Sequence, residues 1–355
     1  MLFSKRLIYW YLQNKRDLPW RKTSNPYYIW ISEIILQQTR VDQGLEYYKK
    51  FIITFPTIYD LAKANEETVL KLWQGLGYYS RARNLLFSAK HIVTQLNGKF
   101  PNTHKDLLKL KGVGDYTASA IASICFNEPT AVVDGNVYRV LARYFGIKTP
   151  INSTKGIKDF KQLAQELIDI KKPATFNQAI MEFGALQCKP KNPDCINCPL
   201  NTSCVALQKK LVKTLPIKDK KIAIKKRYFN YLVILSLKKQ IALKQRKQND
   251  IWKGLYEFPL IETLKEIDLK HLLKTDDYNQ IINHNEVVIS LYNTNSIVHK
   301  LSHQHIYCKF WILYTKQEIA NSIPLSSLDK HPVPILIQNF IEKNPHILSS
   351  LNSDN

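Results

Sequence analysis

The stretch LLKLKGVGDYTASAIASI, residues 107–124, decides the interpretation of the N-terminal part of the chain. Gly112 and Gly114 lie between a segment with helical periodicity and a second helical pattern that begins at about Asp115. Two glycines let the backbone turn so that consecutive amide groups and a helix N-terminus face one anion. The pattern predicts a helix-hairpin-helix that holds a phosphate through Lys111, Gly112 and Gly114. A plain turn between two helices is the alternative, because such a turn also needs glycine.

The chain falls into two regions that differ in the pattern of their apolar residues. From residue 2 to about residue 211, apolar residues recur every three or four positions, which predicts helices. Beyond residue 227, the segments YFNYLVILSL, KQIALKQR, EVVISLY and IYCKFWILYT are rich in β-branched and aromatic residues and predict strands. With 355 residues the chain has room for about two domains. We expect a helical region over 1–212, a basic linker over 213–227, an α+β domain over 228–349 and a frayed tail over 350–355.

The formal net charge of the chain is +22, with a pI near 9.6, as expected of a protein that binds polyanions. A composition rich in Lys, Ile and Asn can also arise from AT-biased coding, so charge alone does not establish nucleic-acid binding. The apolar run LIYWYL, residues 7–12, is too short for a signal peptide and is followed by polar residues. We therefore expect no membrane association and a reducing, cytoplasmic environment.

The stretch CKPKNPDCINCPLNTSC, residues 188–204, holds four of the six cysteines of the chain. In a reducing compartment such a cluster indicates metal or cluster ligands rather than disulfides. Zinc and a [4Fe-4S] cluster both accept four thiolates, and the spacing alone does not choose between them. We expect the two other cysteines, Cys125 and Cys308, to be small buried residues. The candidate ligands are Cys188, Cys195, Cys198 and Cys204.

Two carboxylates are candidates for chemistry. Glu33 is the only charged residue among the seventeen from Thr23 to Thr39, in a helix that Asn25 and Pro26 are suited to start. Burial of Glu33 would raise its pKa and make it an acid near neutral pH. Asp134, in AVVDGNVYRVL, precedes a helical pattern. The structural alternatives are an exposed helical glutamate for the first residue and a helix N-cap for the second.

Five motifs, in one order with the cysteine loop, carry a resemblance to a known family. The chain resembles the endonuclease III superfamily of helix-hairpin-helix DNA glycosylases, and adenine DNA glycosylases in particular. The resemblance implies a mainly α helix-hairpin-helix DNA glycosylase fold with an iron-sulfur cluster loop, plus a C-terminal α+β Nudix-like domain. It also implies that the loop holds a [4Fe-4S] cluster. The motifs are LPWR (18–21), SEIILQQTRV (32–41), WQGLGYYSRARNL (73–85), VVDGNVYRV (132–140) and FNQAIMEFGALQC (176–188).

The resemblance implies base excision repair of double-stranded DNA, by removal of adenine mispaired with 8-oxoguanine or guanine. Glu33 matches the acid that protonates adenine, and Asp134 matches the carboxylate that stabilises or captures the sugar cation. Tyr116 lies where lyase members carry a lysine, so the resemblance implies a glycosylase without a lyase step, with Asn136 in support. The alternatives are a bifunctional glycosylase and lyase for oxidised pyrimidines, and an inactive DNA-binding protein.

The family also assigns residues around the extruded base. Side chains that replace lost stacking are needed, because extrusion costs a few kcal/mol of unstacking. Gln38, Thr39 and Tyr78 would fill or wedge the gap that the base leaves. Lys111, Gly112 and Gly114 would contact the DNA backbone. The residues that would line the adenine pocket are Trp20, Arg21, Leu36 and Gln178.

The segment IWKGLYEFP, residues 251–259, resembles the start of a Nudix-like domain, which this family uses to sense oxidised guanine. A Nudix hydrolase needs an arginine in its catalytic helix, and no arginine follows Arg246. We therefore expect no pyrophosphatase activity. The family's Phe-Ser-His reader corresponds here to Leu301, Ser302 and His303, and the missing phenyl ring puts the strength of lesion discrimination in question. We expect a bacterial-type cytoplasmic monomer associated with the nucleoid through DNA.

Overall fold

A computed structural model describes residues 2–219, 224–283 and 285–349. The expected tail at 350–355 and part of the expected basic linker, residues 220–223, lie outside the described residues. The chain divides into two compact units. The first combines Met1–Lys63 with Asn84–Lys220, and the second combines Ala64–Arg83 with Lys221–Asn355. The short segment Ala64–Arg83 therefore groups with the C-terminal part of the chain.

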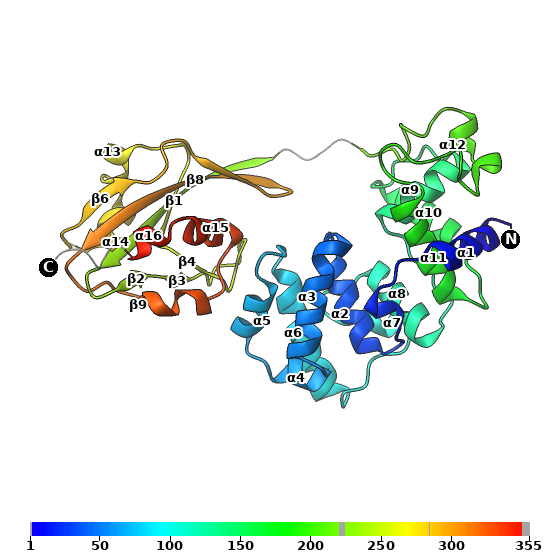
Figure 1. The fold of residues 1–355 in the computed structure, drawn as a ribbon, viewed down its shortest axis with the longest axis horizontal. Helices are drawn as coiled ribbons and strands as arrows, with labels where there is room; N and C mark the ends of the chain where they lie inside the picture. The colour runs from blue at the N-terminus through cyan, green and yellow to red at the C-terminus, as the bar shows by residue number, and fades with distance from the viewer. Residues whose placement is uncertain (1, 220–223, 284, 350–355) are drawn as a thin grey trace. The chain divides into compact units, whose positions relative to one another are not determined.

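The first unit is helical (Figure 1). Its last two short elements, a 3₁₀ turn and a helix, flank the end of the cysteine loop. Helix α6 (Ser80–Gln95) begins in the second unit and continues in the first. The other elements are α1 (Leu2–Asn14), η1 (Pro19–Arg21), α2 (Pro26–Leu36), α3 (Val41–Thr54), α4 (Ile58–Lys63), α7 (His104–Leu107), α8 (Asp115–Phe126), α9 (Gly135–Phe145), α10 (Thr154–Leu167), α11 (Pro173–Leu186), η2 (Asn201–Ser203) and α12 (Val205–Gln208).

Local sequence signals set the ends of the helices that later carry the site. Asn25 caps α2 by accepting a hydrogen bond from the Tyr27 amide at 2.9 Å, and Pro26 is the first helical residue. Both features agree with the prediction. Asp134 caps α9, which ends at Gly146 in the left-handed conformation with φ +70°. A Cβ at Gly146 would also collide with Val205, so only glycine fits there.

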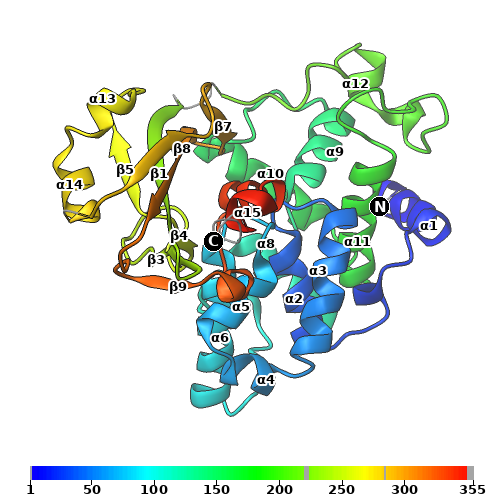
Figure 2. The ribbon, with the colours of Figure 1, turned by 60° about the vertical axis from the view of Figure 1, so that its left-hand side comes forward.

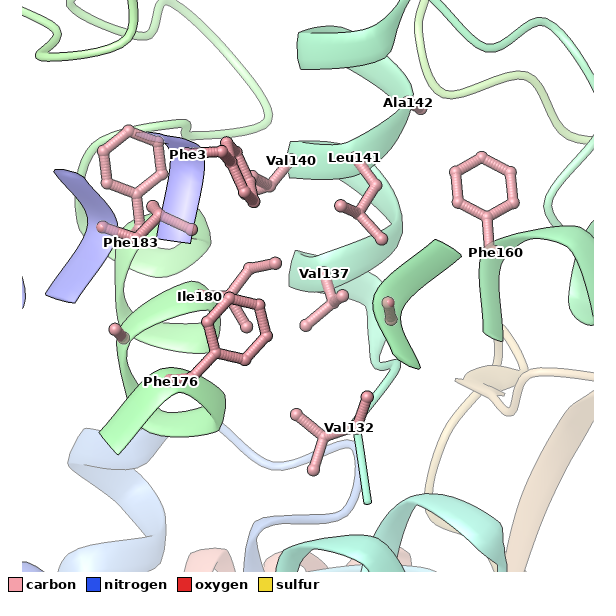
Figure 3. Close-up of a cluster of buried hydrophobic side chains, with 14 of the residues drawn as sticks. Phe3, Val132, Val137, Val140, Leu141, Ala142, Phe160, Phe176, Ile180 and Phe183 are labelled. Atoms are coloured by element: carbon pink, nitrogen blue, oxygen red, sulfur yellow. The ribbon is translucent and has the colours of Figure 1, made fainter. Parts of the chain in front are cut away.

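One hydrophobic core of the first unit lies between α9, α10 and α11, with α1 against α11 (Figure 3). One face of α9 contributes Val137, Val140 and Leu141, the periodic apolar residues from which a helix was predicted. Phe176 and Ile180 project from α11 toward them, and Phe160 approaches from α10. Phe183 of α11 packs edge-on against Trp10 of α1. This packing fixes the N-terminus of α9 relative to α11.

The second unit is built around a seven-stranded sheet. Helix α5 (Glu66–Trp73) belongs to this unit. A separate two-stranded sheet is formed by β3 (Lys244–Gln245) and β4 (Tyr256–Glu257). The other elements are β1 (Lys225–Ser236), β2 (Gln240–Ala242), β5 (Leu260–Thr263), α13 (Leu269–Leu272), α14 (Asp276–Ile282), β6 (Val288–Leu291), β7 (Ile297–Lys300), β8 (Gln304–Thr315), β9 (Ser322–Pro324), η3 (Leu325–Lys330), α15 (Ile335–Lys343) and α16 (Pro345–Ser349).

The long strands β1 and β8 form the centre of the sheet and run parallel, from Lys225 opposite Gln304 to Ser236 opposite Thr315 (Figure 2). The strand order is β6-β8-β1-β2-β9, and β5 pairs with β1 and β7 with β8. Every strand pair except the central one is antiparallel. The strands expected from the β-branched segments are therefore present, whereas β4, β5, β7 and β9 were not predicted.

Helices cover both faces of this sheet (Figures 1 and 2). Alternate residues of a strand point to opposite faces, so Leu232 and Trp311 pack with α13 and α14, while Tyr231 and Phe310 lie on the other side. There the Phe310 ring stacks on Phe340 of α15, with centroids 4.3 Å apart. The helical first unit and the sheet-containing second unit agree with the expected mainly α region and C-terminal α+β domain. Within the described residues, no helix is long and apolar enough to cross a membrane.

Replacing Phe160 by Ala tests the packing of the first unit. Phe160 is fully buried and its ring meets Tyr138 edge-on at 5.2 Å, so we expect a loss of about 3–5 kcal/mol in the free energy of unfolding. Denaturant unfolding followed by circular dichroism measures the change. Ile157→Ala, at an exposed position of the same helix, is the control and should alter stability by less than about 0.5 kcal/mol. Equal effects of the two substitutions would contradict this packing.

Candidate active site

Glu33 lies on the buried face of α2, where its residue is 8% exposed. Burial raises the pKa of Glu33 from its usual 4.5 to about 7, since the charged form loses hydration. A hydrogen bond with Tyr116 acts in the opposite direction, and the nearby charge of Asp134 adds to the rise. The carboxyl can therefore hold a proton near neutral pH and release it to a base in contact with it.

Asp134 is both the N-cap of α9 and a neighbour of Glu33. Its Oδ1 accepts hydrogen bonds from the amides of Asn136 at 2.9 Å and Val137 at 2.8 Å. Its Oδ2 accepts one from Asn136 Nδ2 at 2.8 Å, and Arg139 Nη2 holds Asn136 Oδ1 at 2.8 Å. Burial raises the pKa of Asp134, and these hydrogen bonds act against the rise. The capping role is thus compatible with a carboxylate fixed beside Glu33.

Tyr116, in the first turn of α8, lies close to both of these carboxyl groups. Burial and the charges of Glu33 and Asp134 raise the pKa of Tyr116 well above its usual value of 10.0, so its phenol stays protonated. Its hydroxyl also lies 3.2 Å from Sδ of Met181 on α11. Glu33, Tyr116 and Asp134 therefore come together from three helices.

Of the residues expected around an adenine, the structure brings Arg21 and Gln178 of α11 into direct contact. Arg21 Nε donates to Gln178 Oε1 at 3.0 Å, and both nitrogens of the Arg21 fork bind Glu182 at 2.9 and 2.7 Å. Arg16 binds the same carboxylate at 2.9 and 2.6 Å. Burial opposes ionisation of Glu182, but the hydrogen bonds from Arg21 and Arg16 outweigh it and lower its pKa to about 2. Trp20, beside Arg21, is buried and packs edge-on against Tyr48.

Glu182 was not singled out from the sequence, although it anchors Arg21 and through it Gln178. It is the one acidic residue of the motif FNQAIMEFGALQC, within an otherwise apolar helical pattern. A charge at such a position signals an ion pair in the interior, because charged residues are rarely buried without a partner. That signal was available in the sequence. The partners of Glu182, however, are Arg21 and Arg16, which lie 161 and 166 positions away in the chain.

The residues after α2 form an exposed turn. Leu36, the last residue of α2, packs against Gly44 of α3, where a Cβ would lie 2.7 Å from Leu36 Cδ2. Gln38 is exposed and adopts φ +56°, and Thr39 follows it. Gln37 Nε2 donates to Thr117 Oγ1 at 3.1 Å and so fastens the turn to α8. Gln38 and Thr39 are therefore presented at the surface near the start of α8.

The hairpin between α7 and α8 has the geometry expected of an anion grip. Gly112 adopts φ +85°, and a Cβ there would lie 2.8 Å from Asn84 Cβ, so only glycine is accommodated. Gly114 caps α8 in an extended conformation, with open space where a side chain would project. Lys111 lies over the Phe87 ring at 4.6 Å, and Ser88 Oγ holds its carbonyl at 2.9 Å. The hairpin residues Lys111, Gly112 and Gly114 are all exposed.

The side chains of Cys188, Cys195, Cys198 and Cys204 line one cavity between the cysteine loop and α9. Arg143 of α9 approaches this cavity, with Nη1 3.5 Å from Cys188 Sγ and bound to the Lys189 carbonyl at 2.7 Å. Within the described part of the chain, no group of three or more His, Cys, Asp or Glu side chains is arranged to hold a metal ion. A single zinc would need the sulfurs about 2.3 Å from one point. Four cysteines around one shared cavity are the donor set that a [4Fe-4S] cluster takes, with one thiolate for each iron.

The residues expected at the lesion lie in the second unit. Ser302 and His303 are exposed, with Ser302 Oγ 3.3 Å from His303 Nδ1. Together with Leu301 they line a cavity of about 410 Å³ whose other walls include Tyr78, which is 47% exposed and adopts φ +48°. Of the two remaining cysteines, Cys308 is buried as expected, whereas Cys125 is only partly buried.

Comparison with protein families gives two matches. Residues 31–168 match the HhH-GPD superfamily of base excision DNA repair proteins, and residues 230–343 match the NUDIX domain. The first range contains Glu33, Tyr116 and Asp134, and the second contains Ser302 and His303.

Comparison with known proteins gives relatives along most of the chain. The chain is 38% identical over 326 residues to the adenine DNA glycosylase of Buchnera aphidicola subsp. Baizongia pistaciae, covering 91% of this chain and 89% of the relative. It is 46% identical over 216 residues to the adenine DNA glycosylase of Homo sapiens, covering 58% of this chain and 40% of the relative.

Solved structures resemble the helical part. A thermostable thymine-DNA glycosylase aligns with TM-score 0.55 and 32% identity, over 59% of this chain and 96% of that chain. A non-covalent endonuclease III–DNA complex aligns with TM-score 0.52 and 22% identity over 59% of this chain and 95% of that chain, and so supports the fold alone. The extent and identity of the match to the Buchnera relative decide the assignment: the chain belongs to the adenine DNA glycosylase family of the HhH-GPD superfamily.

Proposed function

We propose that the protein removes adenine mispaired with 8-oxoguanine or guanine in double-stranded DNA, as a monofunctional glycosylase. The observation that carries the proposal is the buried Glu33, whose pKa near 7 suits an acid at physiological pH, beside Asp134 and Tyr116. Adenine DNA glycosylases from several organisms among the relatives support the choice of base.

In the proposed reaction, the Glu33 carboxyl donates its proton to N7 of adenine. The bond between adenine N9 and the sugar C1′ breaks, and its electron pair stays with the base. The Asp134 carboxylate, held by Asn136 and the α9 amides, stabilises the positive charge that develops on the sugar. Water then adds to C1′ and loses a proton to the Glu33 carboxylate, which restores the acid and leaves an abasic site.

Tyr116 supports the monofunctional outcome. A Schiff base with the sugar needs an amine, and a phenol with a raised pKa supplies neither an amine nor an anion. The alternative function, a glycosylase with lyase activity toward oxidised pyrimidines, would require an amine at this position. Tyr116 lies beside Glu33 and acts on the pKa of that carboxyl, while its hydroxyl contacts Met181.

The proposed DNA contacts divide between the two units. In the first, Trp20, Arg21, Leu36 and Gln178 line the pocket for the extruded adenine, with Arg21 and Gln178 already bonded to each other. Gln38 and Thr39 of the same unit are proposed for the gap that the base leaves in the duplex, and the hairpin holds a phosphate. Tyr78, which belongs to the second unit, is proposed for the same role on the DNA. Ser302 and His303 bind the edge of 8-oxoguanine, whose N7 carries a proton that guanine lacks.

We propose that Cys188, Cys195, Cys198 and Cys204 hold a [4Fe-4S] cluster, which would cross-link the cysteine loop to the end of α11, where Cys188 lies. The shared cavity and the approach of Arg143 to Cys188 support this choice. The charge of Arg143 would offset the negative charge of four thiolates. A reducing, cytoplasmic compartment and a monomeric state complete the proposal.

We propose that residues 1–212 supply the chemistry and residues 228–349 read the base opposite adenine, joined by a basic linker over 213–227 and followed by a tail over 350–355. The two family matches fall within the two main ranges, at 31–168 and 230–343. The segment Ala64–Arg83 contributes to the reading unit, since it groups with the C-terminal residues.

The substitution Glu33→Gln tests the function. It removes the proton donor while keeping shape, so single-turnover release of adenine opposite 8-oxoguanine should fall by about 10² to 10⁴-fold or more. Glu46→Gln, at an exposed position paired with Lys49, is the matched control and should leave the rate unchanged. Strand breaks should appear only after alkali. Breaks without alkali on a duplex with thymine glycol would instead establish the lyase alternative.

The pH dependence of the same single-turnover rate tests the acid. Glu33 acts in its protonated form, so its raised pKa of about 7 predicts a rate that falls about tenfold per unit as pH rises above 7. Asp134 acts ionised, so the rate should also fall in acid, beginning above the usual range of an aspartate because burial raises its pKa. A rate that does not decline between about pH 7 and pH 9 would rule out Glu33 as the proton donor.

A further inference from the structure

A cavity within the second unit contains a residue that the proposed function leaves unassigned. Its volume of about 410 Å³ is lined by residues 77–80, Arg83, residues 250–252 and residues 300–303. The last segment holds Ser302 and His303, the proposed readers of the lesion, so any role of this cavity in reading the lesion rests on the proposed function. Trp252 lies in the same wall and brings an indole to the lining.

The backbone of Trp252 is unusual. Its φ of +60° is in the left-handed region, which bulky side chains rarely adopt. Such a conformation persists only where surrounding contacts enforce it, and these residues gather at functional sites. The next glycine, Gly254, also has a positive φ, of +85°, so the chain turns sharply on both sides of Lys253. If residue 252 only had to form a turn, glycine or asparagine would adopt this positive φ with less strain than tryptophan.

Arginine side chains enforce this turn. Arg246 Nε donates to the Ile251 carbonyl at 3.0 Å, and Arg83 Nη1 donates to the Lys253 carbonyl at 2.6 Å. The Trp252 carbonyl accepts from the Leu255 amide at 3.0 Å. Just before the turn, Asp250 pairs with Arg227 at 2.8 Å and with Arg246 at 3.0 Å. The indole is therefore presented on a loop that ion pairs and hydrogen bonds hold in place.

The indole has a defined orientation. Its ring lies 6.2 Å from Phe229, nearly edge-on, and 5.7 Å from His299 at an angle of 55°. The residue is 8% exposed, and it is part of the cavity wall. Burial and the rings on two sides leave the indole little rotational freedom, so the part of Trp252 at the cavity wall is held in place before a base enters, and binding requires little further ordering of this side chain.

We propose that Trp252 is a positioning residue for the purine opposite adenine. Its indole packs against the base and fixes the plane in which Ser302 and His303 reach the N7 edge. The stacking contact itself accepts any base, because every base has a π-face. Once the plane of the base is fixed, 8-oxoguanine is distinguished from guanine, because the hydrogen bonds to the oxidised edge require a particular direction. Trp252 thus supplies the aromatic contact that Leu301 does not.

Single-turnover kinetics on duplexes with A opposite 8-oxoguanine and A opposite G test this inference. Trp252→Leu should lower the rate on the 8-oxoguanine duplex about tenfold, the size of loss expected for one base–aromatic contact, and lower the rate on the guanine duplex by clearly less, because only the oxidised edge offers Ser302 and His303 the N7 proton. Trp252→Phe should retain the preference, and Leu301→Phe should restore it in the Trp252→Leu background. Equal losses on both duplexes, or no loss on either, would overturn the inference.

Tryptophan fluorescence supplies a readout that does not depend on catalysis. In the Glu33→Gln background, binding of the 8-oxoguanine duplex should quench emission, and adding Trp252→Phe should remove that component of the quenching. Identical quenching in both proteins would overturn the contact. If the unsubstituted protein shows no kinetic preference for 8-oxoguanine, the lesion part of the proposed function fails, while this measurement still decides whether Trp252 meets the base.

Discussion

A carboxyl group enclosed among α2, α8 and α9 is the constraint on which the active centre depends. Glu33 is enclosed because its helix is apolar nearly all round, so any orientation that buries its neighbours buries it as well. Burial raises its pKa from 4.5 to about 7, and the protein therefore binds a proton there on folding. Proton binding by Glu33 therefore contributes to the free energy of unfolding. This contribution is fully present below about pH 4.5 and is lost as the pH rises through 7, and the loss is about 3 kcal/mol in total. The fold tolerates that loss at working pH, as is typical of residues kept for chemistry.

The remaining parts of the centre hold this carboxyl in a fixed setting. Helix α11 presents Gln178, Met181 and Glu182 three and four positions apart, hence on one face. Met181 touches the Tyr116 hydroxyl, and Glu182 binds Arg16 and Arg21. Removing one of these ionised groups leaves a buried charge without a partner. The resulting loss in the free energy of unfolding is larger than the net stabilisation that the intact ion pairs provide. The apolar core between α9 and α11 thus fixes the acid, the cap and the pocket together.

An interaction could be predicted from the sequence when its partners lie close together in the chain, and could not when they lie far apart. The start of α2 at Asn25 and Pro26, and the cap at Asp134, depend on neighbours within three residues and were read directly. The ion set of Glu182, the pairing of β7 with β8 and the grouping of residues 64–83 with the C-terminal part depend on partners far apart in the chain. The left-handed backbone of Trp252 had no local signal, because the contacts that enforce it come from Arg83 and Arg246. Family resemblance named the candidate site residues, but their burial and charge states came from the fold.

The protonation of Glu33 is the central claim, and infrared difference spectroscopy of the free protein measures it most directly. The carboxyl stretch that is present in the protein and absent from Glu33→Gln reports the titration of this one residue. We predict that this band persists at pH 6 and disappears with a midpoint near pH 7, as burial of the carboxyl requires. A midpoint near the usual 4.5 would contradict the account, because Glu33 would then be ionised at neutral pH and unable to act as the acid.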